Sequence, residues 1–196
     1  VMGGAVGIRA DGAANVSAIR DRVTVPIIGI NKQRQPEYQV YITPTLEAAI
    51  EVIEAGAEIV ALDGSTAPRP GGITLRELIR GVKERGALVM ADISTLSEGL
   101  VAAEQGADIL SSTLSGYTPY SAKMEGPDLA LVEDLAQQTE LPVIAEGRYS
   151  TPEDVRAAFD CGAFAVVVGR AITEPQLITK RFASVTPRNR ASESGL

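Results

Sequence analysis

The 196-residue chain contains no histidine and no tryptophan, and its only cysteine is Cys161. The absence of histidine excludes nucleophiles activated by imidazole, and it excludes zinc or iron sites that depend on imidazole ligands. A single cysteine cannot form an internal disulfide. Any acid–base chemistry must therefore be carried by carboxylates, lysines, tyrosines or water.

Basic residues are also scarce, since 18 Lys and Arg face 25 Asp and Glu and leave a net charge of −7. Such a chain has no basic field for a phosphate backbone, so no nucleic-acid partner is expected. Nothing in the sequence resembles a signal peptide or an apolar run of about 18 or more residues, so we expect no membrane association and a cytoplasmic location. A hydrophobic content of 45% suffices for the core of one domain.

Short apolar runs alternate with amphipathic segments at intervals of roughly 20–35 residues, the spacing of βα units. Each run is nearly continuous in Val, Ile, Leu or Ala, which is typical of parallel strands buried on both faces. Seven strands are predicted, at Ala5–Arg9, Val25–Ile30, Ala57–Asp63, Ala87–Asp92, Ala107–Thr113, Leu141–Glu146 and Ala163–Gly169.

The intervening segments carry helix signals. Thr74 with Glu77 and Thr95 with Glu98 have capping-box spacing, while Thr43 and Thr151 precede prolines and are predicted to cap helices. Glycines that end helices stand at Gly56, Gly86, Gly106 and Gly162.

The pattern predicts an α/β protein, a (β/α)8 TIM barrel of the phosphate-binding type. A Gly-Ala pair precedes three predicted strands and recurs at Gly4–Ala5, where no helix stands before it. With seven strands in place of eight, we expect a barrel that lacks its first βα unit. It would occupy residues 1–183 as a single N-terminally truncated domain, followed by a flexible tail over 184–196. An open doubly wound sheet is the alternative, although no Gly-x-Gly-x-x-Gly motif follows the first strand.

Active sites of parallel barrels lie at the carboxyl ends of the strands, where the βα loops converge. Here those ends are rich in charge, and closing the barrel would bring opposite charges together. The polar and glycine residues at these ends are Arg9, Asn31, Lys32, Asp63, Asp92, Ser112, Thr113, Ser115, Glu146, Arg148, Gly169 and Arg170.

Three of these residues also have ordinary structural explanations. Lys32 stands in a polar stretch and could be a solvated loop residue, but strand alternation places it on the face of Ile28 and Ile30. Asp63 precedes a glycine and could be a turn residue, and Asp92 could be a supporting hydrogen-bond partner. Glu146 favours function most strongly, because it follows a buried strand and a buried carboxylate needs a partner.

Gly147 and Gly169 end the last two predicted strands, where barrels often bind phosphate through backbone N–H groups. Each is followed by an arginine, Arg148 or Arg170. This arrangement indicates a phosphorylated ligand.

Several motifs together resemble the N-acetylmannosamine-6-phosphate 2-epimerase family (N-acylglucosamine-6-phosphate 2-epimerases), over essentially the whole chain. The run Thr113–Thr118 is the most specific, since related phosphate-binding barrels share the glycine turns but lack it. The matching stretches are Gly7–Ala10, Pro26–Lys32, Tyr41–Thr45, Ala61–Asp63, Met90–Thr95, Thr113–Thr118, Ile144–Arg148, Val168–Gly169 and Ala171–Thr173.

The resemblance implies an epimerase that interconverts N-acetylmannosamine 6-phosphate and N-acetylglucosamine 6-phosphate in sialic-acid and amino-sugar catabolism, without metal or other cofactor, and usually as a homodimer. Lys32 and Glu146 would be the catalytic pair. By motif position, Arg9 and Asp92 would contact the sugar, and we expect further substrate contacts from Asp63, Thr113, Ser115 and Arg148. Gly147, Gly169 and Arg170 would bind the phosphate.

Three features depart from the family pattern. The initial strand with its Ser-Cys-Gln motif is absent, the usual Lys-Arg pair reads Lys32-Gln33, and Arg170 replaces the small residue that often follows Gly169.

Inverting C2 requires removal of a proton beside the carbonyl of the open-chain sugar. Lys32 is the expected base and Glu146 the expected partner in ring opening or proton delivery. Two alternatives stay open, a Schiff-base aldolase or lyase that uses Lys32 and a truncated barrel that binds a sugar phosphate without turnover.

Overall fold

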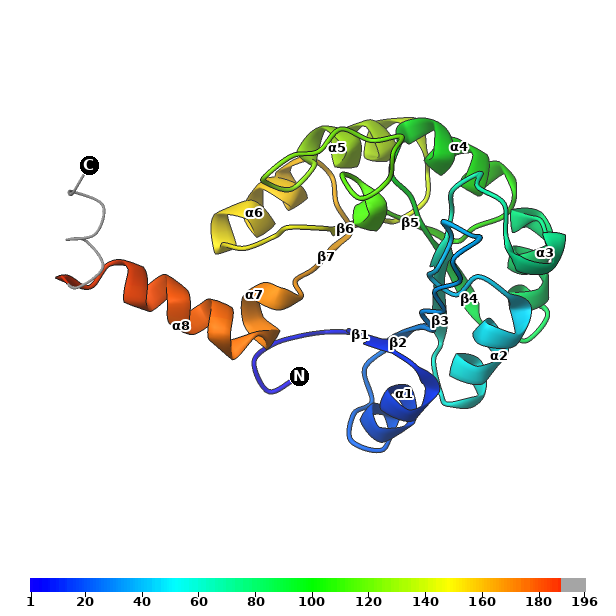
Figure 1. Cartoon of the computed structure of the whole chain (residues 1–196), viewed down its shortest axis with the longest axis horizontal. Coiled ribbons are helices and arrows are strands. Elements are labelled where there is room, and N and C mark those ends of the chain that lie inside the picture. Colours follow the sequence, from blue (N-terminus) through cyan, green and yellow to red (C-terminus); the bar gives the residue numbers. More distant parts are fainter. Residues whose placement is uncertain (188–196) are drawn as a thin grey trace.

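The computed structural model of the chain describes residues 1–187 and contains one sheet of seven parallel strands that hydrogen-bond in chain order (Figure 1). All seven predicted strands are present, most of them one or two residues shorter than predicted. Three strands differ in their ends: the first ends at Asp11 and not at Arg9, the fifth at Ser111 and not at Thr113, and the seventh at Val167 and not at Gly169. The strands are β1 (Ile8–Asp11), β2 (Ile27–Ile30), β3 (Ile59–Asp63), β4 (Leu88–Asp92), β5 (Ile109–Ser111), β6 (Val143–Glu146) and β7 (Ala165–Val167).

Helices follow the strands and lie outside them, so that the sheet curls into a nearly closed barrel (Figure 1). The strand order is sequential throughout, which excludes a doubly wound sheet because its order reverses at a switch point. The helices are α1 (Ala13–Arg20), α2 (Leu46–Glu54), α3 (Leu75–Lys83), α4 (Leu96–Glu104), α5 (Leu129–Gln138), α6 (Pro152–Asp160), α7 (Arg170–Thr173) and α8 (Pro175–Ser184), with 3-10 turns at Pro70–Gly72 and Ser112–Leu114.

The predicted helix caps are confirmed at Thr74, Thr95 and Thr151, each of which forms a capping box with the acidic residue three positions later. The cap predicted at Thr43 is wrong. Helix α2 begins two residues later with Thr45 as its N-cap, and Thr43 has a φ of 45°. Its hydroxyl donates to Ala61 O at 2.7 Å and accepts the Asn31 N–H at 3.1 Å, so this side chain ties β2 to β3.

Alternation along the strands builds two apolar layers. One set of side chains packs against the helices and includes Ile27, Leu62 and Val89. The other set fills the inside of the barrel, with Ile28, Ile30 and Met90 among its members. The inward positions lead upward into the polar residues at the carboxyl ends of the strands.

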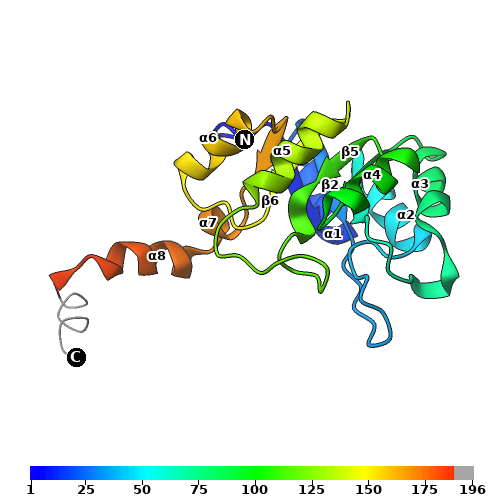
Figure 2. The same cartoon turned by 90° about the horizontal axis from the view of Figure 1, so that it is seen from above.

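Helix α8 projects away from the barrel in both views (Figures 1 and 2). The tail predicted from Ser184 begins at the last residue of this helix, and its residues 188–196 lie outside the described part of the chain. Within residues 1–187, no helix combines the length and the apolarity needed to cross a membrane.

Candidate active site

The polar residues at the carboxyl ends of the strands converge because they continue the inward rows. Arg9 pairs in register with Ile28, whose side chain lies inside the barrel. Asp92 and Glu146 stand two residues after the inward Met90 and Ile144. Strand alternation therefore directs all three charged side chains to the interior.

Arg9, Asp92 and Glu146 form a buried charge network. The Arg9 guanidinium donates two hydrogen bonds to the Asp92 carboxylate, at 3.0 and 2.5 Å. Its Nη1 also lies 3.0 Å from Glu146 Oε2. The Asp92 side chain is 0% exposed, so Arg9 provides the partner that a buried carboxylate requires.

Hydroxyl groups from the end of β5 complete the network. Thr113 Oγ1 lies 2.8 Å from Asp92 Oδ1 and 3.1 Å from Glu146 Oε2, and Ser111 Oγ lies 2.8 Å from the same Thr113 oxygen. The buried Ser112 hydroxyl accepts the Glu146 N–H at 3.1 Å and donates to Glu146 O at 3.0 Å. These contacts fix both the main chain and the carboxylate of Glu146.

Burial and pairing act in opposite directions on the ionisation of this network. Burial raises the pKa of Glu146, an effect that Asp92 reinforces and that Arg9, Thr113 and Lys32 oppose. For Arg9, burial alone would lower the guanidinium pKa, but Asp92 and Glu146 outweigh it and the net shift is upward. The site therefore holds a permanent cation beside a carboxyl group whose pKa is raised toward neutrality, a property of many proton-transfer sites.

Lys32 stands at the edge of this network, directly after β2. Its backbone forms a bridge with Ile42, which folds the segment after β2 into a short hairpin. Its ammonium lies 3.6 Å from Asp11 Oδ2, and it interacts electrostatically with Glu146. Ile28 and Ile30 do line the inside of the barrel, and theirs is the strand face on which Lys32 is predicted to lie.

Asp63 turns toward its own loop. Its carboxylate accepts the Ser65 N–H at 2.9 Å, the bond expected of a turn aspartate. Burial raises the pKa of this carboxyl, although the bonds from Ser65 oppose the shift. Arg69, almost fully buried, donates to the main-chain oxygens of Asp63 and Ser65 and so fixes the loop.

Ser115 and Arg148 hold the loop that follows β5. The Ser115 hydroxyl donates to Asp128, the N-cap of α5, at 2.5 Å. Arg148 donates to Ser115 O at 2.7 Å and to Gly126 O at 2.6 Å, and its guanidinium lies 5.2 Å from the centre of the Tyr117 ring. Neither side chain joins the network around Arg9.

The predicted phosphate residues occupy the two strand ends next to each other. Gly147 has a φ of 113°, and Arg148 beside it has a φ of 62°, so the turn after β6 is sharply bent. Gly169 is the N-cap of the short helix α7. Arg170 opens that helix, and its Nε lies 2.7 Å from Glu174 Oε2 with the side chain 79% exposed. Arg170 therefore points into an ion pair along its own helix.

The structure adds Asp11, which sequence reasoning missed, and shows the contacts that Ser112 makes. Asp11 could have been found from the period of two, since it shares a strand face with Arg9. Ser112 was noted at its strand end but given no role. No sequence signal marks it, because its two bonds to Glu146 join residues 34 positions apart.

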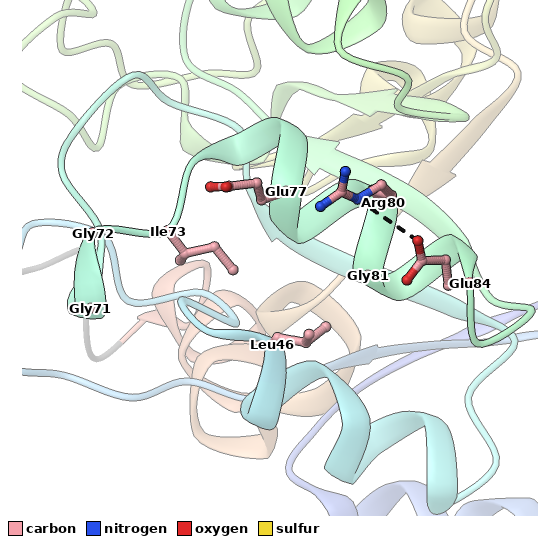
Figure 3. Close-up of a pocket in the computed structure, with 8 residues that line it drawn as sticks. All are labelled: Leu46, Gly71, Gly72, Ile73, Glu77, Arg80, Gly81 and Glu84. Atoms are coloured by element: carbon pink, nitrogen blue, oxygen red, sulfur yellow. Dashed lines mark ion pairs between the residues drawn. The ribbon is translucent and has the colours of Figure 1, made fainter.

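One hollow of the structure lies apart from this site. A hollow of about 440 Å³ lies on the outside, between α2 and α3, and includes the Arg80–Glu84 ion pair and Leu46 (Figure 3). None of the predicted site residues lines it. Among residues 1–187, no group of three or more Cys, Asp or Glu side chains is arranged to hold a metal ion.

Comparison with known proteins places this geometry in a family. Residues 1–188 match the family described as "Putative N-acetylmannosamine-6-phosphate epimerase". A relative from Caldanaerobacter subterraneus, named "Putative N-acetylmannosamine-6-phosphate 2-epimerase", is 51% identical over 97% of this chain and 81% of its own length. A relative of the same name from Clostridioides difficile is 47% identical over 95% of this chain and 84% of its own length.

A solved structure is also similar. It is the N-acetylmannosamine-6-phosphate 2-epimerase from Clostridium perfringens, with a TM-score of 0.90 and 44% identity over 94% of this chain and 81% of that chain. The barrel fold and the sequence motifs therefore agree on one assignment, and the chain belongs to the N-acetylmannosamine-6-phosphate 2-epimerase family.

Proposed function

We propose that the chain interconverts N-acetylmannosamine 6-phosphate and N-acetylglucosamine 6-phosphate by removing and returning the proton at C2, as a step in sialic-acid and amino-sugar catabolism. The observation that carries the proposal is the buried Arg9–Asp92–Glu146 network with Lys32 at its edge. It supplies a cation, a carboxyl group of raised pKa and an amine within one site, and the family name supplies the substrate.

Lys32 is the base in this proposal. The open-chain sugar has an aldehyde at C1, which acidifies the proton at C2. The Lys32 amine takes this proton, the electron pair of the C2–H bond moves toward the carbonyl oxygen, and a planar enediolate forms. Return of a proton to the opposite face of C2 gives the epimer.

The charged network acts on the oxygen atoms of the sugar. Arg9 is held rigidly by Asp92, so it can stabilise negative charge on the enediolate without reorganising. Glu146 has a raised pKa and can carry the proton that ring opening and closing require. Thr113 contacts both carboxylates and would orient the sugar hydroxyls together with Asp63.

The phosphate end of the substrate is assigned to the Gly147 and Gly169 turns with Arg148 and Arg170. Gly169 precedes a helix start, where free N–H groups favour an anion. Arg148 and Ser115 would shape this end through the loop that they hold. Arg170 would have to leave Glu174 to reach a phosphate.

Two further proposals concern partners and location. We propose a homodimer, supported by α8, which projects from the barrel (Figure 2). The apolar Phe182 and Val185, near the end of this helix, are exposed. An acidic chain of net charge −7 supports a small-molecule partner over nucleic acid and is consistent with a cytoplasmic protein.

The test is conversion of N-acetylmannosamine 6-phosphate, followed by proton NMR, with the wild-type chain and Lys32→Ala. The proposal predicts that the gluco epimer accumulates with the wild type and not with the variant. Covalent trapping of substrate on Lys32 by borohydride, with cleavage products in place of the epimer, would show an aldolase or lyase and overturn the proposal. Binding without any turnover by the wild type would contradict it as well.

A further inference from the structure

Asp11, the last residue of β1, holds Lys32 at two points. Its Oδ1 accepts the Lys32 N–H at 3.0 Å, and its Oδ2 lies 3.6 Å from the Lys32 ammonium. We propose that Asp11 is a positioning residue for the reaction, which holds both the main chain and the ammonium of Lys32 in place. This inference rests on the proposed role of Lys32 as the base.

The fold brings the two residues together through strand register. Asp11 pairs with Ile30, the last residue of β2, and Lys32 lies two positions beyond it on the same face. The bridge between Lys32 and Ile42 directs the chain back toward β3, so the Lys32 N–H is available to an acceptor from β1. The Asp11 carboxylate provides that acceptor.

The other charged groups near Lys32 are already engaged. Glu146, from β6, acts on Lys32 but is paired with Arg9 of β1. Arg34, in the loop that continues the hairpin, lies over the ring of Tyr41 at 4.0 Å from its centre. Asp11 is therefore the carboxylate that forms a direct ion pair with the Lys32 ammonium among residues 1–187.

Both side chains are partly open to solvent, at 44% for Lys32 and 43% for Asp11. An ion pair of this exposure is weak, so it can be broken when the amine moves toward C2. After the proton transfer, Lys32 is an ammonium again and Asp11 stands beside it. Asp11 thus stabilises the state in which the proton has left the sugar.

The test uses Asp11→Asn, which keeps an oxygen for the Lys32 N–H and removes the charge. Asp108→Asn is the matched control. Asp108 accepts the Val89 N–H at 2.9 Å and pairs with the Lys83 ammonium at 2.6 Å, so it also combines a main-chain bond with an ion pair to lysine, but divides them between two residues outside the site. The readouts are kcat and KM for both variants and the wild type, with Asp11→Glu as the conservative rescue.

We expect Asp11→Asn to lower kcat by roughly tenfold through misplacement of Lys32. KM should stay unchanged, since Asp11 contacts Lys32 and not the substrate. Asp11→Glu keeps the charge and should restore most of kcat. Asp108→Asn should leave kcat and KM within a factor of about two.

An unchanged kcat in Asp11→Asn, or a rise in KM without a loss of kcat, would overturn the inference. An equal loss of kcat in Asp108→Asn, or no recovery of kcat in Asp11→Glu, would also overturn it. The proposed function fails separately, through binding of the sugar phosphate without turnover by the wild type.

Discussion

The two ends of the barrel share one kind of contact, in which an acidic side chain accepts a main-chain N–H and also pairs with a basic side chain. The contact serves a different purpose at each end. At the amino ends of the strands, Asp108 accepts a strand N–H and pairs with Lys83, and Glu58 accepts the Ile27 N–H at 2.9 Å and pairs with Arg20. At the carboxyl ends, Asp11 accepts the Lys32 N–H and pairs with the Lys32 ammonium. Each acidic residue links two adjacent strands or their loops.

The difference between the two ends lies in how tightly the lysine ammonium is held. Lys83 Nζ lies 2.6 Å from Asp108 and also donates to Gly106 O at 3.0 Å, so its protons are engaged. Lys32 Nζ lies 3.6 Å from Asp11 and faces a carboxyl of raised pKa across the barrel. A lysine pinned by close partners serves stability, whereas a loosely paired one can move a proton.

The largest expected effect separates the two lysines by activity. Lys32→Ala should lower kcat/KM by roughly 10³-fold, because a general base contributes about 10²–10⁴-fold. Lys83→Ala should leave kcat/KM within a factor of about two, since this residue lies at the stability end. Steady-state kinetics with N-acetylmannosamine 6-phosphate measures both, and equal losses in the two variants would erase the distinction.

The second effect compares the two ends by stability. Arg9→Met leaves the buried Asp92 and Glu146 carboxylates without their cation and should destabilise the fold by about 3–5 kcal/mol. Lys83→Met removes a partly exposed pair and should cost about 1 kcal/mol or less. Urea denaturation gives both values, and a comparable cost at the two positions would contradict the burial argument.

The third effect tests the loop that Arg148 holds. Gly116 and Gly86 have nearly equal φ values, of 79° and 81°, so replacing either with alanine should cost roughly 1–2 kcal/mol of backbone strain. A Cβ at Gly116 would lie 2.8 Å from Arg148 Nη1, whereas one at Gly86 would meet no atom within 4 Å.

Gly116→Ala should therefore also lower kcat/KM, by roughly tenfold, through displacement of Arg148. Gly86→Ala should lose stability alone. Unfolding curves and kinetics on the same preparations separate the two effects, and full activity of Gly116→Ala would detach this loop from the site.

The smallest expected effect is an opposite pH dependence of the stability that two carboxyl groups contribute. The pKa of Glu146 is raised by burial, so its contribution to stability is present at low pH and is lost as the pH rises through the folded value. The pKa of Glu77 is lowered by its bonds to Thr74, so its contribution is present above the ordinary glutamate range and is lost as the pH falls.

The melting temperature of Glu146→Gln relative to the wild type should thus rise as the pH increases above about 4, the ordinary glutamate pKa. That of Glu77→Gln should fall as the pH increases toward this value from below. Thermal melts on both sides of this pH test the signs. Parallel trends in the two variants would show that burial does not govern Glu146.

Most of the fold was predictable because it follows local rules. Continuous apolar runs predicted seven parallel strands, and Thr–Glu spacing predicted the caps at Thr74 and Thr95. The cap at Thr43 was mispredicted because its hydroxyl bonds across strands, to Ala61 O. By local rules alone, a threonine before a proline is equally suited to the start of a helix.

The site was only partly predictable, because its contacts join distant residues. Strand ends identified Arg9, Asp92 and Glu146, and the alternation explains why they meet. The turn role of Asp63 was foreseen as an alternative. The partners of individual hydrogen-bond donors could not be predicted. Arg148, for example, donates to carbonyl groups of the long segment after β5, whose course the sequence does not reveal.

The most direct test of the account is the fate of the C2 proton when the wild-type chain and Lys32→Ala act on N-acetylmannosamine 6-phosphate in deuterium oxide. We predict that proton NMR shows the gluco epimer with deuterium at C2 in the wild type, and neither conversion nor exchange in the variant. Exchange at C2 that persists at the wild-type rate in Lys32→Ala would contradict the assignment of Lys32 as the base.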